Sequence, residues 1–285
     1  MMIRFALSIQ LMTSVALFAF AQGEEPRPIQ FRWTKGQVAK YKVEQSVQLA
    51  ETSIDEKSRK PVLTTTTTKL QASKTWTVTE VDDAGVATLE MTITAMRQEI
   101  NQATGDEKPM RNILDSTKPE DAQAMTFLNK PSVTIRVNPQ GELIEAKSAN
   151  DGVADRLKVE LPFRVMLPKA AIKTGSNWQN KFVLKLPPPL GTGEKFDGIH
   201  KYSLKGFNGD VAVFGMKTEL VKPLEDTGLM PAIMHSLWNG DVFVNTKLGT
   251  YAGAKLNIKK EIANYIGPGT KLSYENEYVE VVDTK

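Results

Sequence analysis

Residues 70–95 read LQASKTWTVTEVDDAGVATLEMTITA, and this stretch decides the fold class. Apolar and polar residues alternate on both sides of the turn-forming segment Asp82-Asp83-Ala84-Gly85. The apolar positions share one face on each side: Leu70, Ala72, Trp76 and Val78 before the turn, and Ala87, Leu89, Met91, Ile93 and Ala95 after it. A period of two that is interrupted by turn residues predicts an antiparallel β-hairpin with one buried face.

The same alternation extends outward from this hairpin. It recurs in residues 39–49, 133–137 and 274–282, and the threonine run Thr64–Thr68 favours an extended strand. Helical patterns are confined to three short segments, at residues 119–129, 153–159 and 228–238. The sequence therefore predicts a mainly β protein with two related antiparallel sheet units, half-barrel or barrel-like, and a few short helices. One closed barrel and two separate lobes both fit the pattern.

An internal duplication is the most informative pattern in the chain. Residues 34–37 (TKGQ) match residues 173–176 (KTGS), and the hairpin at 83–91 matches the one at 208–216. A short helix follows in each half, and then residues 135–138 (IRVN) match 242–245 (VFVN) before a glycine turn. Chance similarity of short β patterns is the alternative. The shared order of three anchors favours two copies of one unit.

The chain divides into five parts on these patterns. Residues 1–21 are predicted to be a signal peptide, with Arg4, an apolar run and cleavage after Ala19-Phe20-Ala21. A retained anchor is the alternative, but the run is short for a membrane span. Residues 22–30 follow as a disordered leader. The remainder is a first β unit at 31–148, a connector at 149–172 whose apolar part, Leu161–Pro168, is expected to be packed, and a second β unit at 173–285.

Composition limits the function classes. The chain has 285 residues, 36 Lys+Arg, 33 Asp+Glu and a net charge of +3, without a basic cluster, so a nucleic-acid partner is not expected. The absence of cysteine excludes disulfides, thiolate catalysis, iron–sulfur clusters and thiolate zinc sites. Once the signal peptide is removed, no segment is long enough to span a membrane. We expect a secreted or periplasmic protein.

Catalytic chemistry has little support in the sequence. The two histidines, His200 and His235, are interpreted as an exposed turn residue and a helix-face residue, because nothing in the sequence brings them together. Asp82-Asp83 is interpreted as a turn, and no nucleophile elbow or phosphate-binding loop occurs. The sequence predicts no catalytic residues, no metal site and no cofactor.

One segment is a candidate for ligand binding. Residues 228–238 (GLMPAIMHSLW) place two methionines and several other apolar side chains within a short helix. Methionine makes a compliant apolar surface that can accept varied shapes. The candidate ligand contacts are Met230, Ile233, Met234, Leu237 and Trp238. A plug in the core is the alternative for this helix, and also for Trp33, Trp76 and Trp178.

Three elements carry a resemblance. The strand start Gly175-Ser176-Asn177-Trp178, the hairpin Gly85-Val86-Ala87 and the segment Val242–Asn245 with its later glycine resemble an uncharacterised family of secreted bacterial proteins, described only as a domain of unknown function. The resemblance implies no activity, ligand or catalytic residue. In fold alone, the pattern is similar to half-barrel envelope carriers of lipids and lipoproteins, in which a curved sheet wraps short helices.

Three functions remain open on the sequence alone. The first is an exported, non-catalytic binding module that holds an apolar or amphiphilic small molecule in a curved sheet. The second is an envelope structural or protein-interaction module that contacts another envelope protein through the loops at 51–60 and 101–112. The third, which has the weakest support, is a hydrolase that uses His200 or His235.

Overall fold

A computed structural model describes residues 25–148, 152–186, 188, 191–224 and 227–284. Residues 1–21, the predicted signal peptide, lie outside the described ranges. The first half contains β1 (Val38–Ile54), β2 (Pro61–Val81), β3 (Ala87–Thr104), β4 (Met110–Asp115), the 3-10 helix η1 (Pro119–Met125), β5 (Pro131–Val137) and β6 (Leu143–Ser148). After helix α1 (Val153–Glu160), the second half contains β7 (Asn177–Leu186), β8 (Glu194–Asn208), β9 (Val211–Leu220), η2 (Thr227–Leu229), α2 (Met230–Ile233), η3 (Met234–Ser236), β10 (Asn239–Asn245), β11 (Thr250–Ala263) and β12 (Lys271–Val282).

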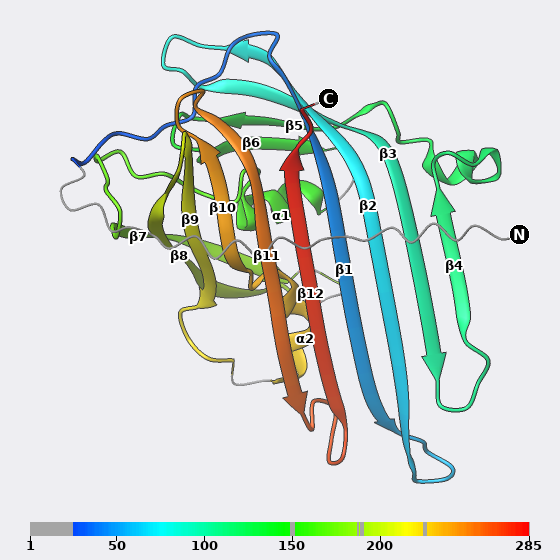
Figure 1. Cartoon of the computed structure of the whole chain (residues 1–285). Helices are drawn as coiled ribbons and strands as arrows, with labels where there is room; N and C mark the ends of the chain where they lie inside the picture. The colour runs from blue at the N-terminus through cyan, green and yellow to red at the C-terminus, as the bar shows by residue number, and fades with distance from the viewer. Residues whose placement is uncertain (1–24, 149–151, 187, 189–190, 225–226, 285) are drawn as a thin grey trace, which may run out of the picture.

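The strands form one antiparallel sheet with the order β6-β5-β3-β2-β1-β12-β11-β10-β9-β8-β7, and β4 also pairs with β3. β1 and β12 join the two halves, with pairs that run from Tyr41 and Val282 to Thr52 and Lys271. The predicted mainly β, antiparallel fold with a few short helices is confirmed. The sheet is continuous and open, because the described edge strands β6 and β7 do not pair with each other. It curls around α1 (Figure 1).

The connector between the halves fills the inside of the curl. Phe163 is 1% exposed, and its ring lies 5.1 Å from that of Trp33, 5.5 Å from Phe31, 5.6 Å from Tyr251 and 5.8 Å from Trp76. These rings come from the N-terminal segment and from both halves of the sheet. The prediction of a packed connector is confirmed, and its aromatic contacts hold the two halves together.

Two local expectations need correction. Residues 25–30 of the predicted disordered leader are ordered, because Arg27 pairs with Ile172 and Ile29 is buried beneath the sheet. The loops expected at 51–60 and 101–112 are shorter, because β1 continues to Ile54, β3 continues to Thr104 and β4 begins at Met110. Hydrogen-bonded pairing with neighbouring strands extends β1 and β3 into residues whose polar sequence predicted loops.

The matched segments of the two halves make matched contacts. The amide of Gly36 donates to the carbonyl of Val78, and the amide of Gly175 donates to that of Leu204, at 2.8 Å in both cases. In return, the amide of Val78 donates to the carbonyl of Gln37, and the amide of Leu204 donates to that of Ser176, at 2.9 Å in both cases. The short helices also follow the hairpins in both halves, as expected. These equivalences agree with a duplication, and the duplication and its domain boundaries stay predictions.

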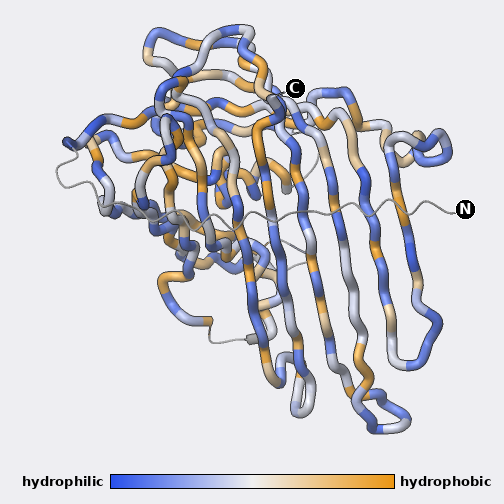
Figure 2. The backbone as a smooth tube through the Cα atoms, viewed as in Figure 1, coloured by the Kyte–Doolittle hydropathy of each residue, from blue (hydrophilic) through white to orange (hydrophobic). Residues whose placement is uncertain are grey.

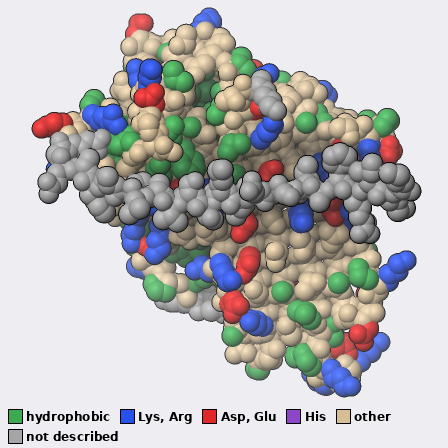
Figure 3. Space-filling view, viewed as in Figure 1, with side chains coloured by type: hydrophobic (Ala, Val, Ile, Leu, Met, Phe, Trp, Pro, Cys, Tyr) green, Lys and Arg blue, Asp and Glu red, His purple; other side chains and the backbone are tan. Residues whose placement is uncertain are grey.

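The long central strands continue past the core. The part of the sheet beyond the core is called the blade here. It consists of the far ends of β1, β2, β3, β4, β11 and β12, and its residues are mostly hydrophilic or intermediate in Figure 2. The outer face of this blade is mostly polar, with scattered hydrophobic and charged side chains (Figure 3). Hydrophobic segments gather where the sheet curls over α1. None of the described helices is both long and apolar enough to cross a membrane.

A glycine at the centre of the sheet provides a test of the strand packing. Gly253 in β11 has φ +136°, and a Cβ there would lie 2.1 Å from the backbone oxygen of Glu280. Gly267 has φ +138°, with nothing within 4 Å of such a Cβ. We expect Gly267→Ala to lower the free energy of unfolding by about 1 kcal/mol through backbone strain. Gly253→Ala has the same strain and also a clash with the Glu280 oxygen, so its loss should be about 1 kcal/mol larger than that of Gly267→Ala. Urea unfolding of both variants measures the difference, and equal losses would contradict the close approach of β11 and β12.

Candidate functional site

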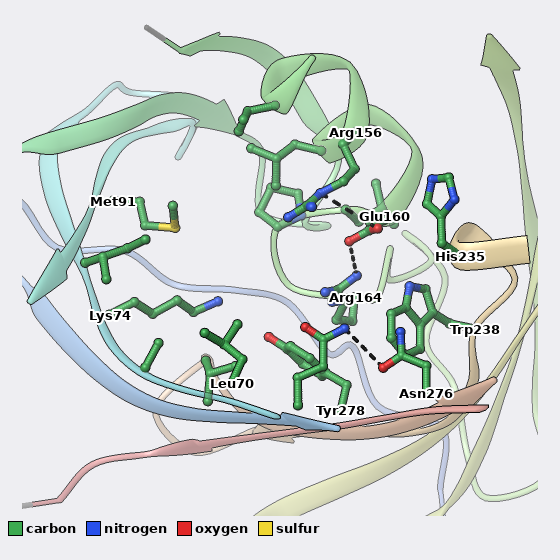
Figure 4. Close-up of a pocket in the computed structure, with 18 of the residues that line it drawn as sticks. Leu70, Lys74, Met91, Arg156, Glu160, Arg164, His235, Trp238, Asn276 and Tyr278 are labelled. Atoms are coloured by element: carbon green, nitrogen blue, oxygen red, sulfur yellow. Dashed lines mark hydrogen bonds and ion pairs between the residues drawn. The ribbon is translucent and has the colours of Figure 1, made fainter. Parts of the chain in front are cut away.

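A cavity of about 280 Å³ lies between the inner face of the sheet and helix α1. Its walls come from β1, β2, β3 and β12 on the sheet side, and from α1, the start of the connector and the segment around η3 on the other side. Figure 4 shows charged side chains near the middle of this space and apolar side chains from β2 and β3 on one side. The cavity therefore has two chemically distinct parts.

The apolar part follows from strand alternation. Inward positions on β2 and β3, together with one face of α1, supply hydrocarbon side chains: Leu70, Ala72, Met91, Ile93, Val153 and Leu157. Such a surface removes apolar ligand area from water, which stabilises binding by roughly 25 cal/mol per Å².

The charged part centres on a buried ion pair between α1 and the connector. Glu160 Oε2 lies 2.7 Å from Arg164 Nη1, and Glu160 Oε1 lies 3.8 Å from Arg156 Nε. Burial acts to raise the pKa of Glu160, but the charges of Arg164 and Arg156, together with the hydrogen bond from Arg164, outweigh it and lower that pKa below its usual value. Burial acts to lower the pKa of Arg164, but the charge of Glu160, with smaller contributions from Tyr278, Tyr251 and Glu280, outweighs it and raises that pKa. Both side chains are therefore charged inside the protein.

The backbone that presents Arg164 is unusual. Leu161 and Arg164 both have φ near +59°, a left-handed conformation that residues with a Cβ rarely adopt. The guanidinium carbon of Arg164 lies 4.9 Å from the ring centre of Tyr278 and 5.7 Å from that of Trp238. These cation–π contacts and the ion pair offset the strain and fix the guanidinium at the cavity wall.

A second ion pair lies in the sheet itself. Lys74 on β2 places its Nζ 2.7 Å from Oε1 of Glu280 on β12, and Glu280 is fully buried. The hydroxyls of Tyr278 and Tyr251 donate to the other carboxylate oxygen at 2.6 and 3.1 Å. Burial and the Glu280 charge raise the pKa of both tyrosines well above the usual value, so they remain donors. Lys74 also lines the cavity, where Figure 4 shows its side chain extending toward Arg164.

Two indole groups at the cavity lack acceptors. Trp76 and Trp238 are each 3% exposed, both line the cavity, and neither Nε1 has a hydrogen-bond partner among the described residues. In Figure 4 the indole nitrogen of Trp238 lies on the side of His235. Because the indole N–H is only a donor, each indole can bind an acceptor on a ligand.

The five predicted ligand contacts separate in the structure. Trp238 lines the cavity, and so does its neighbour His235. Ile233 and Leu237 pack in a small cluster with Leu184 and Leu186, while Met234 is buried in the main core and Met230 packs against both. Helical periodicity could not show which side of this short segment faces the cavity. Of the other tryptophans, Trp76 lines the cavity, whereas Trp33 and Trp178 pack against the core.

The two histidines lie in different places. The expectation of an exposed His200 is wrong: it is 2% exposed, its Nε2 lies 2.7 Å from the Val159 carbonyl and its Nδ1 lies 3.0 Å from the Thr218 hydroxyl. His200 therefore links β8 to α1 and β9 and has a structural role. His235 borders the cavity, and its pKa is lowered chiefly by burial, against the opposing effect of Glu160. A neutral imidazole is therefore expected there at pH 7.

The charged residues of the site were missed at the level of sequence. Lys74 lies between Ala72 and Trp76 on the inward face of β2, and Glu280 follows Tyr278 on the inward face of β12. Most other residues on these two faces are apolar. Arg164 lies inside the apolar connector. A charged side chain at a position that periodicity assigns to the core is the signal that identifies such residues.

Comparison with known proteins does not identify a family. No family model and no curated protein matches the chain. Among solved structures, the chain is similar to one that describes lipid–protein interactions in lipovitellin, with 10% identity and a TM-score of 0.47 over 88% of this chain. It spans only 25% of that lipovitellin chain. It is also similar to DynF from the dynemicin biosynthesis pathway of Micromonospora chersina, with 9% identity and a TM-score of 0.22, covering 99% of this chain and 94% of DynF.

Proposed function

We propose that the protein is an exported, non-catalytic binding module that holds an apolar or amphiphilic small molecule in the cavity between the curled sheet and α1. The observation that carries this proposal is the cavity itself, with its apolar wall from β2, β3 and α1 and its buried charged groups on the facing side. Export rests on the signal-peptide pattern of residues 1–21.

The size and lining of the cavity support a small ligand. Its volume of about 280 Å³ is just below the range of roughly 300 to 1,000 Å³ that is typical of small-molecule sites. A single short hydrocarbon chain or a compact aromatic molecule of two or three rings suits this space. The described lining contains no serine, threonine or cysteine, so it offers no hydroxyl or thiol nucleophile of the Ser, Thr or Cys type.

Filling the apolar wall tests the proposal. Ile93 on β3 lines the cavity, and Ile93→Trp would occupy space that a ligand needs. We expect the variant to bind the neutral fluorescent probe N-phenyl-1-naphthylamine about tenfold more weakly than the unmodified protein, since that corresponds to about 1.4 kcal/mol of lost contact. Fluorescence titration measures both affinities, and circular dichroism checks that the sheet is retained.

Thr94→Trp is the matched control, because Thr94 is the next residue along β3, is exposed and does not line the cavity. It should bind the probe as the unmodified protein does. Equal affinity of all three proteins, or no binding by any of them, would show that the cavity does not hold apolar ligands.

A further inference from the structure

We propose that the ligand is a single-chain amphiphile with an anionic head group, and that Lys74, Arg164 and Trp238 bind this head group. The inference rests on the proposed function and adds the chemical class of the ligand. The head group would lie beside these three residues, with the hydrocarbon tail against Leu70, Met91 and Ile93.

The balance of charge at the cavity favours an anion. Lys74, Arg156 and Arg164 supply three cations, and the carboxylates that contact them are Glu160 and Glu280. One positive charge is left in excess around a cavity that is partly open to solvent, because the two buried cations are each paired and Arg156 is 64% exposed. An anionic group that enters this space is attracted more strongly than it would be at a surface, because the surroundings screen less.

The hydrogen-bond donors around the cavity are incompletely used. Arg164 has five N–H donors and Lys74 has three, and each directs one nitrogen at a carboxylate. The indole N–H of Trp238 has no acceptor among the described residues. A buried donor without a partner is unfavourable, so an acceptor-only group such as a carboxylate gains from these donors.

Positions of the charged groups also set the orientation of the ligand. The side chain of Arg156 is 64% exposed, whereas those of Arg164 and Lys74 are 10% and 15% exposed. Arg156 therefore stands at the mouth, where it can attract an anion before the buried pair binds it. The left-handed backbone at Leu161 and Arg164 holds the guanidinium in place before the ligand arrives, which reduces the cost of ordering it.

A head-group series tests the proposal. Octanoate, octanol and octylammonium carry the same chain with a negative, neutral and positive end. At pH 7.5 we expect isothermal titration calorimetry to show octanoate binding about tenfold or more tightly than octanol, with octylammonium the weakest. Equal binding of octanoate and octanol would overturn the anionic head group but leave the proposed function standing. If none of the three bound, both the proposed function and this inference would fall.

The double variant Lys74→Met/Glu280→Leu removes the ammonium together with its partner carboxylate, so no buried charge is left alone. We expect its preference for octanoate over octanol to fall several-fold, with octanol affinity retained. The matched control is Lys42→Met, because Lys42 lies on neighbouring β1 opposite Ser73 and is 53% exposed. A double variant that kept the full preference would overturn the role of Lys74, and so would a control that lost it.

Discussion

Replacing Glu280 by leucine is expected to lower the free energy of unfolding by about 3 kcal/mol, near the lower end of the range for a broken buried ion pair. The carboxylate is fully buried, and its loss leaves the Lys74 ammonium without a counter-charge and two tyrosine hydroxyls without their acceptor. The lower end applies because Lys74 borders the cavity and retains some access to water. Urea unfolding monitored by circular dichroism measures the change.

The double variant Lys74→Met/Glu280→Leu should recover most of this loss, because replacing both members of a buried pair by apolar residues is often neutral or stabilising. Glu275→Leu provides the surface comparison, since its partner Lys259 is exposed and the pair is screened by solvent. We expect a much smaller change there. If Glu280→Leu unfolded at the same urea concentration as the unmodified protein, the network around Glu280 would contribute nothing to stability.

The fold was largely predictable because strand alternation is a local property of the sequence. The hairpin around Asp82–Gly85 and the segments 133–137 and 274–282 all form strands, and the short helices lie close to the expected positions. The loops at 51–60 and 101–112 were predicted to be too long. Glu51–Ile54 and Asn101–Thr104 have mostly polar sequences and become strands through pairing with neighbouring strands. The sequence of one segment does not show which distant strand it will pair with.

The site was much less predictable, because it depends on contacts between distant parts of the chain. Lys74 and Glu280 are 206 positions apart in sequence and meet only because β2 and β12 both flank β1. Arg164 reaches the cavity through two left-handed residues that no propensity indicates. The segment 228–238 drew attention by its composition, but composition cannot show that Trp238 lines the cavity while Ile233 packs in a small cluster beside it.

Acidification is expected to destabilise the protein between about pH 6.5 and pH 4, chiefly through His200. Burial lowers the pKa of His200 from 6.5 to about 4, against the opposing effect of its hydrogen bond to the Val159 carbonyl. The unfolded chain therefore binds a proton in this range that the folded protein does not. Stability falls as the pH decreases through the window, by about 3 kcal/mol in total for a shift of this size. Below pH 4 the folded protein binds the proton as well, and this contribution levels off.

The structural reason is that His200 is held as a neutral tautomer. Its Nε2–H donates to the Val159 carbonyl of α1, and its Nδ1 accepts from the Thr218 hydroxyl. A protonated ring would turn Nδ1 into a donor and would place a positive charge in a buried position under the repulsion of Arg164. Acid should therefore loosen the attachment of α1, which forms one wall of the cavity, before the sheet unfolds.

Urea unfolding at pH 7, 6, 5 and 4, on the protein and on His200→Gln, measures this effect. Glutamine can donate to the same carbonyl but does not titrate, so the variant should be less stable at pH 7 and show a flatter dependence down to pH 4. His235 titrates in the same direction and remains in both proteins, so a residual slope is expected. The lowered pKa of Glu160 adds a loss only as the pH falls below the ordinary glutamate value. If the two proteins had the same slope between pH 6.5 and 4, His200 would not be the titrating group.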